Sequence, residues 1–143
     1  KLPAINITSP NELFTVVEKN DSLFVRQQKS QKEIKTGFLS TKIQQLAWAE
    51  SNKHLIMLLA SKEKGKQSTN DMGKSILTIF DLQKKKIVKM FDTVGSKRFV
   101  LIGDFLIFDN GFGKDSHIEI FKLESQSNFK TIKINGGCGL RNI

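Results

Sequence analysis

The stretch Ile76-Leu77-Thr78-Ile79-Phe80-Asp81-Leu82, followed by a polar turn and by Ile87-Val88-Lys89, decides the fold. Its layout of an apolar strand, a turn and a second strand occurs twice more. The other copies are Ser22–Arg26 with Glu33–Lys35, and Ile118–Leu123 with Thr131–Lys133. Short β-branched or aromatic segments bounded by polar clusters are typical of strands. The sequence therefore predicts a repeated all-β structure.

The copies recur at a nearly constant interval. Leu77 and Ile118 lie 41 positions apart, whereas Leu23 and Leu77 lie 54 apart. Thirteen mostly polar residues, 61–73, account for the difference as a loop insertion, since 54 − 13 = 41. Four-stranded propeller blades repeat about every 40–45 residues. We expect a single all-β domain or domain segment over residues 1–143, with repeats at about 11–41, 42–92 and 97–135.

Eleven strands are expected along the chain. They are Leu13–Val17, Leu23–Arg26, Glu33–Phe38, Ile43–Trp48, Leu55–Ala60, Ile76–Asp81, Ile87–Phe91, Phe99–Ile102, Phe105–Asp109, His117–Leu123 and Lys130–Ile134. The unbroken apolar run Leu55–Ala60 suits a strand that is buried on both faces. A helix over 42–60 is the alternative there, but Ser51-Asn52-Lys53 interrupts the helical period.

The second repeat resembles a blade of the WD40 family. In that family the first strand often ends in an apolar-Trp pair, as Ala47-Trp48 does here, and the third strand carries an apolar-x-apolar-Trp-Asp motif. The corresponding residues are Ile79-Phe80-Asp81, with Phe in the Trp position. The Asp is missing from Ile120-Phe121-Lys122 and Val25-Arg26, and the family's Gly-His pair is absent. The resemblance is therefore to a divergent WD40-like β-propeller.

This resemblance implies a partial β-propeller of four-stranded antiparallel blades. An isolated blade has two apolar faces that must be covered by neighbours. Closed propellers typically have 4–8 blades, so three repeats imply continuation into further blades of the same protein. A β-trefoil, which also has three repeats of four strands, is the alternative fold.

Composition excludes several classes of protein. Only one of the 143 residues is cysteine, so an internal disulfide scaffold is impossible. No run of 18 apolar residues is present, so we expect no transmembrane segment. These features favour an intracellular protein, cytoplasmic or nuclear. Asn6-Ile7-Thr8 and Asn20-Asp21-Ser22 match the N-glycosylation acceptor, which matters only in a secreted chain.

Basic residues are the candidate interaction sites. The chain has 23 Lys and Arg against 14 Asp and Glu, a formal charge of +9. The clustered positions are Lys62, Lys64 and Lys66, then Lys84, Lys85 and Lys86, then Lys97 and Arg98. Such clusters attract acidic partners, and RNA phosphates or an anionic membrane are the candidates here. Solvated turns of a lysine-rich protein are the alternative.

We expect no catalytic site and no cofactor. Ser68–Ser75 resembles a phosphate-binding loop, but it lacks the first glycine and precedes a strand instead of a helix. His54 and His117 adjoin strand segments with no catalytic partner in the sequence pattern, and Cys138 has no second metal ligand nearby.

The function expected from these observations is a non-catalytic protein-interaction scaffold on a WD40-like propeller. A basic propeller that binds RNA or a ribonucleoprotein is one alternative. A trefoil-type module that binds a soluble ligand or carbohydrate is another.

Overall fold

The computed structural model describes residues 7–60, 74–94, 96, 98–111 and 116–134. Within these ranges the chain forms eleven strands, and a single 3-10 turn, η1 (Ser40–Lys42), is the only helical element. No helix in this part of the chain is long and apolar enough to cross a membrane.

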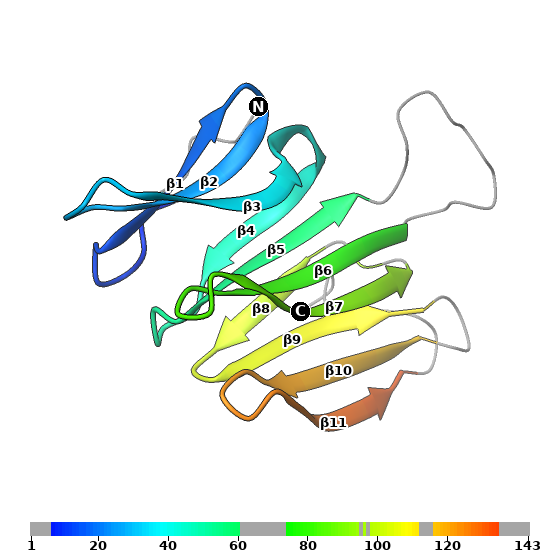
Figure 1. Cartoon of the computed structure of the whole chain (residues 1–143). Coiled ribbons are helices and arrows are strands. Elements are labelled where there is room, and N and C mark those ends of the chain that lie inside the picture. The colour runs from blue at the N-terminus through cyan, green and yellow to red at the C-terminus, as the bar shows by residue number, and fades with distance from the viewer. Residues whose placement is uncertain (1–6, 61–73, 95, 97, 112–115, 135–143) are drawn as a thin grey trace.

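The strands form three antiparallel sheets in chain order (Figure 1). The first sheet contains β1 (Phe14–Lys19), β2 (Ser22–Gln27) and β3 (Glu33–Leu39). The second sheet contains β4 (Ile43–Trp48), β5 (His54–Ala60), β6 (Lys74–Asp81) and β7 (Lys86–Val94). The third contains β8 (Phe99–Ile102), β9 (Phe105–Asn110), β10 (His117–Lys122) and β11 (Ser127–Lys133).

The all-β prediction is confirmed, and both alternatives are wrong. The alternative of a helix over 42–60 is replaced by the expected pair of strands, which form a hairpin in which Asn52 takes a left-handed conformation at φ 63° between β4 and β5. In the described residues each strand pairs only with strands that precede or follow it directly in the chain. A β-trefoil would pair strands from different repeats, so the sheets fit successive blades of a partial β-propeller.

The first sheet differs from the expected four-stranded blade. Its three strands are extended only by an isolated bridge, in which Thr8 pairs with Thr15 of β1. The Val16 amide donates to the Ile7 carbonyl at 3.2 Å, and the Ser9 amide donates to the Phe14 carbonyl at 2.8 Å. Residues 7–9 therefore occupy the position beside β1 that β4 has beside β5.

Strand β5 lies at the centre of the core because both of its faces are covered. Successive side chains of a strand point to opposite faces of the sheet. Leu55, Met57 and Leu59 pack in a cluster with the first sheet, whereas Ile56 and Leu58 pack in a cluster with the third. The two-sided burial expected for Leu55–Ala60 is confirmed up to Leu59, and Ala60 is half-buried at the strand end.

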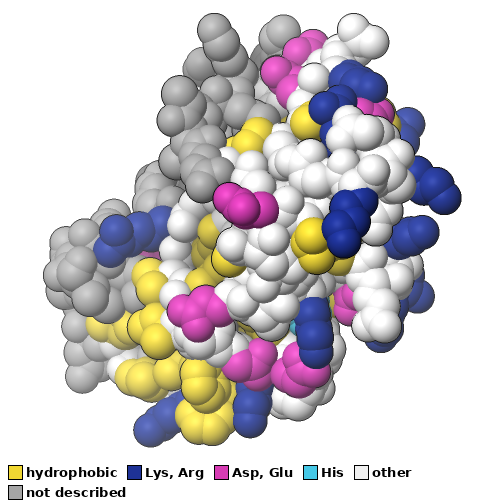
Figure 2. Space-filling model, turned by 90° about the vertical axis from the view of Figure 1, so that its left-hand side faces the viewer, with side chains coloured by type: hydrophobic (Ala, Val, Ile, Leu, Met, Phe, Trp, Pro, Cys, Tyr) yellow, Lys and Arg dark blue, Asp and Glu magenta, His cyan; other side chains and the backbone are white. Residues whose placement is uncertain are grey.

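The third sheet has one covered face and one open face. Its covered face contacts β7, where the Phe91 ring lies 4.9 Å from that of Phe108 and 5.1 Å from that of Phe121. The face turned away from the second sheet carries apolar side chains, among them the exposed Ile102, Phe129 and Ile132. Figure 2 shows hydrophobic side chains gathered at the lower end of the molecule, where Figure 1 places this sheet.

The open face of the first sheet is ionic. Arg26 pairs directly with Thr15 and Glu33 across the strands, on the face opposite to the buried Val16 and Val25. There Glu33 Oε1 lies 2.7 Å from Lys19 Nζ, and Glu33 Oε2 lies 2.9 Å from Arg26 Nη2. The two outward faces of the described structure thus differ in chemistry.

Candidate binding groove at the turn end of the first two sheets

A groove of about 600 Å³ lies between the first two sheets, at the end where β2 turns into β3, β4 into β5 and β6 into β7. It is lined by Phe14, Gln27, Lys32, Glu33, Ile34, Asn52, Lys53, Leu82, Gln83 and Lys85. Figure 2 looks onto this end of the molecule and shows several lysine and arginine side chains there. The groove therefore combines an apolar floor with a basic rim.

The predicted basic residues are only partly brought together. Lys84, Lys85 and Lys86 are exposed around the β6–β7 turn, and Lys85 lines the groove. Arg98 is also exposed, but the whole length of β7 separates it from that turn. The remaining candidates, Lys62, Lys64, Lys66 and Lys97, lie outside the described residues.

Two groove lysines were missed in the sequence. Lys32 precedes β3 and Lys53 precedes β5, and each stands alone in its own turn. A search for contiguous charge finds Lys84–Lys86 and passes over such single residues. Both lysines could have been found from their positions in the turns between predicted strands, because turns at the same end of successive sheets become neighbours when the sheets stack.

Glu33 is the acidic residue of the groove, and its charge is compensated. Hydrogen bonds from Lys19 and then Arg26 lower the pKa of its carboxyl group, so it is ionised at neutral pH. Two cations therefore accompany this carboxylate on the outward face of the first sheet. The groove keeps a net positive rim from Lys32, Lys53 and Lys85.

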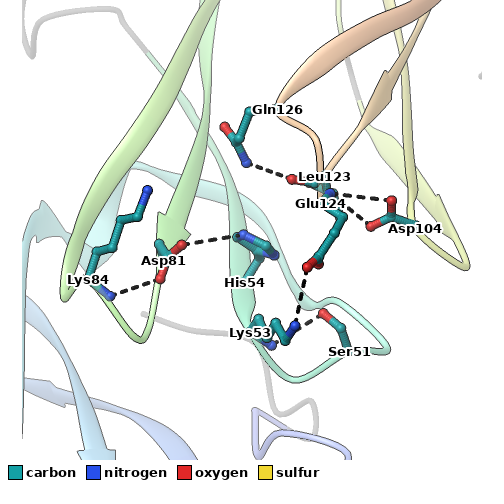
Figure 3. A network of polar contacts seen from close by, with 9 residues as sticks. All are labelled: Ser51, Lys53, His54, Asp81, Lys84, Asp104, Leu123, Glu124 and Gln126. Carbon is teal, nitrogen blue, oxygen red and sulfur yellow. Dashed lines mark hydrogen bonds and ion pairs between the residues drawn. The ribbon is translucent and has the colours of Figure 1, made fainter.

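A polar network beside the groove connects the second and third sheets (Figure 3). Lys53 Nζ contacts Glu124 Oε1 at 3.3 Å, and the Glu124 amide donates to Asp104 Oδ1 at 3.0 Å. His54 Nε2 lies 3.6 Å from Asp81 Oδ2, while Asp81 Oδ1 accepts the Lys84 amide at 2.9 Å. Asp81 thus closes the β6–β7 turn, and Lys53 joins the β4–β5 turn to the turn before β11.

His54 is buried, with 6% of its side chain exposed. Burial lowers the pKa of its imidazole, and the negative charges of Asp81, Glu124 and Asp104 oppose that effect. Its Nδ1 atom is buried and has no hydrogen-bond partner. His117 Nε2 lies 3.4 Å from Glu119 Oε2 on β10. Within the described ranges, no three His, Cys, Asp or Glu side chains gather as a metal site requires.

No known family matches the chain, and no curated protein is similar to it in sequence. Solved structures do resemble it. Acylaminoacyl peptidase from Pyrococcus horikoshii matches with a TM-score of 0.63 and 12% identity, over 94% of this chain and 25% of the peptidase. The β-propeller domain of the Trilobed protease from Pyrococcus furiosus matches with a TM-score of 0.58 and 16% identity, over 90% of this chain and 41% of that one.

A third similar structure is Kuenenia stuttgartiensis hydrazine synthase, with a TM-score of 0.55, 15% identity, and coverage of 90% of this chain and 36% of the other. At such identities the likeness shows the fold, which is a partial β-propeller. The chain spans about a quarter of the length of the acylaminoacyl peptidase it matches.

These similarities correct the expected function. The non-catalytic scaffold was inferred from the propeller shape, but structures of this shape occur in peptidases. The expectation of a non-catalytic scaffold is therefore wrong. The RNA-binding alternative rested on the basic clusters of a propeller, and the trefoil-type alternative does not survive the sheet topology.

Proposed function

We propose that the chain is part of the propeller domain of a larger hydrolase that acts on peptides. The observation that carries this proposal is the match of its three sheets, over 94% of the chain, to acylaminoacyl peptidase. The propeller would form a rigid domain that packs beside a catalytic domain elsewhere in the same protein. Propeller loops on such a scaffold are well placed to contact a substrate.

We also propose that this chain supplies no catalytic group. His54 is buried and turned toward Asp81, so its imidazole has little access to a substrate. The open apolar face of the third sheet supports continuation into another blade, because exposed Ile102, Phe129 and Ile132 need a covering sheet.

The test uses Z-Gly-Gly-Phe-chloromethyl ketone, which is bound in one acylaminoacyl peptidase structure. The full-length protein is expected to hydrolyse N-acylated peptides and to lose that activity as the reagent alkylates it. Mass spectrometry of the digested protein should locate the adduct outside residues 1–143. His54→Gln, as a control in this chain, should be labelled at an unchanged rate.

Two results would contradict these proposals separately. A full-length protein that neither cleaves N-acylated peptides nor reacts with the reagent would refute the peptidase proposal. An adduct on a residue within 1–143 would refute the proposal that the catalytic groups lie elsewhere.

The WD40 type remains a proposal for the propeller as a whole. Phe80, in the Trp position of the family motif, is buried at 1% exposure, and Asp81 accepts the Lys84 amide in the turn that follows. Further apolar-x-apolar-Trp-Asp motifs, spaced as in residues 76–135, should occur in the full-length sequence. Blades that lack the motif throughout would contradict this assignment.

We propose a cytoplasmic or nuclear location, which the single cysteine in 143 residues favours. Asn20 offers a direct test because it lies in the exposed β1–β2 turn within a glycosylation acceptor. Protein made in its native cells should show no mass shift after glycan removal. A glycan on Asn20 would contradict an intracellular location.

A further inference from the structure

The basic groove has lysines from three turns that are distant in sequence. Lys32 comes from the first sheet, whereas Lys53 and Lys85 come from two different turns of the second. All three side chains belong to exposed residues. Because the three lysines line one groove of about 600 Å³, their positive electrostatic potentials add within it.

Neighbouring acidic groups do not cancel this potential. Glu33 is held by Lys19 at 2.7 Å and by Arg26 at 2.9 Å. Lys53 contacts Glu124 at 3.3 Å, but both side chains are more than half exposed. Such a surface pair contributes little and can exchange for another carboxylate. Lys32 and Lys85 make no ion pair with any described residue.

The floor of the groove is apolar and firmly held. Phe14 stacks on Trp48 with ring centroids 6.2 Å apart, and Ile34 packs against the same cluster. Leu82 is 6% exposed and belongs to that cluster. The Asn52 side-chain amide is already bonded to the Asn11 amide and the Glu50 carbonyl, but the side-chain amides of Gln27 and Gln83 also line the groove. They provide groups of the kind that hydrogen-bond a peptide backbone.

We propose that the groove binds an extended acidic peptide segment with an apolar side chain among its carboxylates. The carboxylates would meet Lys32, Lys53 and Lys85, and the apolar side chain would rest against Leu82. A single phosphate would fill only a small part of the groove and reach few of the separated lysines. Stacking of RNA bases is disfavoured, because one face of the Phe14 ring is already used by Trp48.

The test measures binding of a fluorescein-labelled peptide, Asp-Glu-Asp-Leu-Asp-Glu, to the full-length protein by fluorescence anisotropy. Replacement of all three groove lysines, Lys32→Gln with Lys53→Gln and Lys85→Gln, should weaken binding about tenfold, or about 1.4 kcal/mol. Replacement of the peptide leucine by serine should also weaken it. Binding should decline as salt is raised.

A matched triple variant controls for net charge. Lys122→Gln, Lys130→Gln and Lys133→Gln remove three exposed lysines from the third sheet, none of whose described residues lines the groove. This variant should bind like the unchanged protein, and both triple variants should keep the same urea midpoint. A groove variant that unfolds early would be replaced by Lys85→Gln alone, with about a twofold effect expected.

Three results would overturn the proposal. The first is no binding of the peptide to the unchanged protein at low salt, and the second is an equal loss of affinity in the two triple variants. Displacement of the peptide by single-stranded RNA or inorganic phosphate, at concentrations below those of unlabelled peptide, would assign the groove to a different ligand. The proposal is independent of any hydrolase activity, since binding is measured without turnover.

Discussion

His54 shows how one residue in this fold depends on its surroundings. Its side chain is 6% exposed at the start of β5, with Asp81 Oδ2 at 3.6 Å from Nε2. Asp81, Glu124 and Asp104 favour the charged imidazole, but burial dominates and lowers the pKa below its ordinary value of 6.5. The folded protein therefore prefers a neutral His54.

This preference makes stability depend on pH. Below pH 6.5 the unfolded chain binds a proton at His54 more readily than the folded chain does, so the free energy of unfolding falls as the pH falls. The loss should continue down through the lowered pKa of the folded state. Urea titrations at pH from about 7.5 to about 5.5 should show a steeper decline for the unchanged protein than for His54→Gln.

Since carboxylates also titrate in acid, the informative quantity is the difference between the two proteins. Equal declines over that range would show that His54 does not contribute to the pH dependence.

At the scale of elements, β5 is the strand whose side chains matter most for stability. Ile56 is fully buried between the second and third sheets. Ile56→Ala should lower the free energy of unfolding by about 2–5 kcal/mol, because it removes buried methyl groups and leaves a cavity. Met90→Ala on β7, where the side chain is 51% exposed, is the control and should change it by less than about 0.5 kcal/mol. Comparable losses in urea titrations would contradict this account of the core.

The turns before β3, β7 and β11 share a strained feature. Gln31, Lys85 and Gln126 adopt left-handed conformations with φ of 58°, 57° and 54°. An L-residue with a side chain pays about 1–2 kcal/mol there, whereas glycine does not. The recurrence indicates that the same turn geometry closes the last hairpin of each sheet.

Lys85→Gly should therefore be better tolerated than Gln83→Gly in the same turn. Both substitutions raise the backbone entropy of the unfolded chain equally, but only Lys85→Gly removes the steric strain of a side chain at a left-handed position. We expect Lys85→Gly to be the more stable by about 1 kcal/mol in urea titrations. The reverse order would contradict the strain at Lys85.

Much of the strand pattern was predictable because it is local. The apolar run Leu55–Ala60 is too short for a typical helix and is bounded by turn residues, and Asn20-Asp21 suits the left-handed turn that it forms at φ 50° and 65°. The turn at Lys85 was not predictable in this way, since lysine has no preference for a left-handed conformation. The meeting of Lys32 and Lys53 with Lys85 depends on how sheets stack, which no local pattern records.

At the scale of the whole molecule, the open face of the third sheet is the largest departure from a self-sufficient fold. Ile102 and Phe129 are 59% and 60% exposed, and Phe129 lies 5.1 Å from Phe105 in an edge-on ring contact. An isolated sheet with such a face lacks a covering neighbour.

Residues 1–143 produced alone should consequently bind a hydrophobic dye and self-associate. The full-length protein should do neither to the same extent, because further blades would cover this face. A triple variant, with Ile102→Ser, Phe129→Ser and Ile132→Ser, should lower the dye fluorescence of the isolated segment. As a control, Leu13→Ser and Leu39→Ser replace exposed residues just before β1 and at the end of β3, and they should change the fluorescence less. A monomeric segment without dye binding would show that the face needs no cover.

Because one outward face of the segment is ionic and the other is apolar, contacts made at the two faces should depend differently on temperature. Apolar contacts lose strength on cooling, whereas the cost of desolvating charged groups falls on warming. A neighbour seated beside Lys19, Arg26 and Glu33 would thus be held better in heat, and one seated on the third sheet would loosen first in the cold. Chilling should therefore begin to separate the blades at the third sheet, whereas contacts at the ionic face of the first sheet should persist on warming.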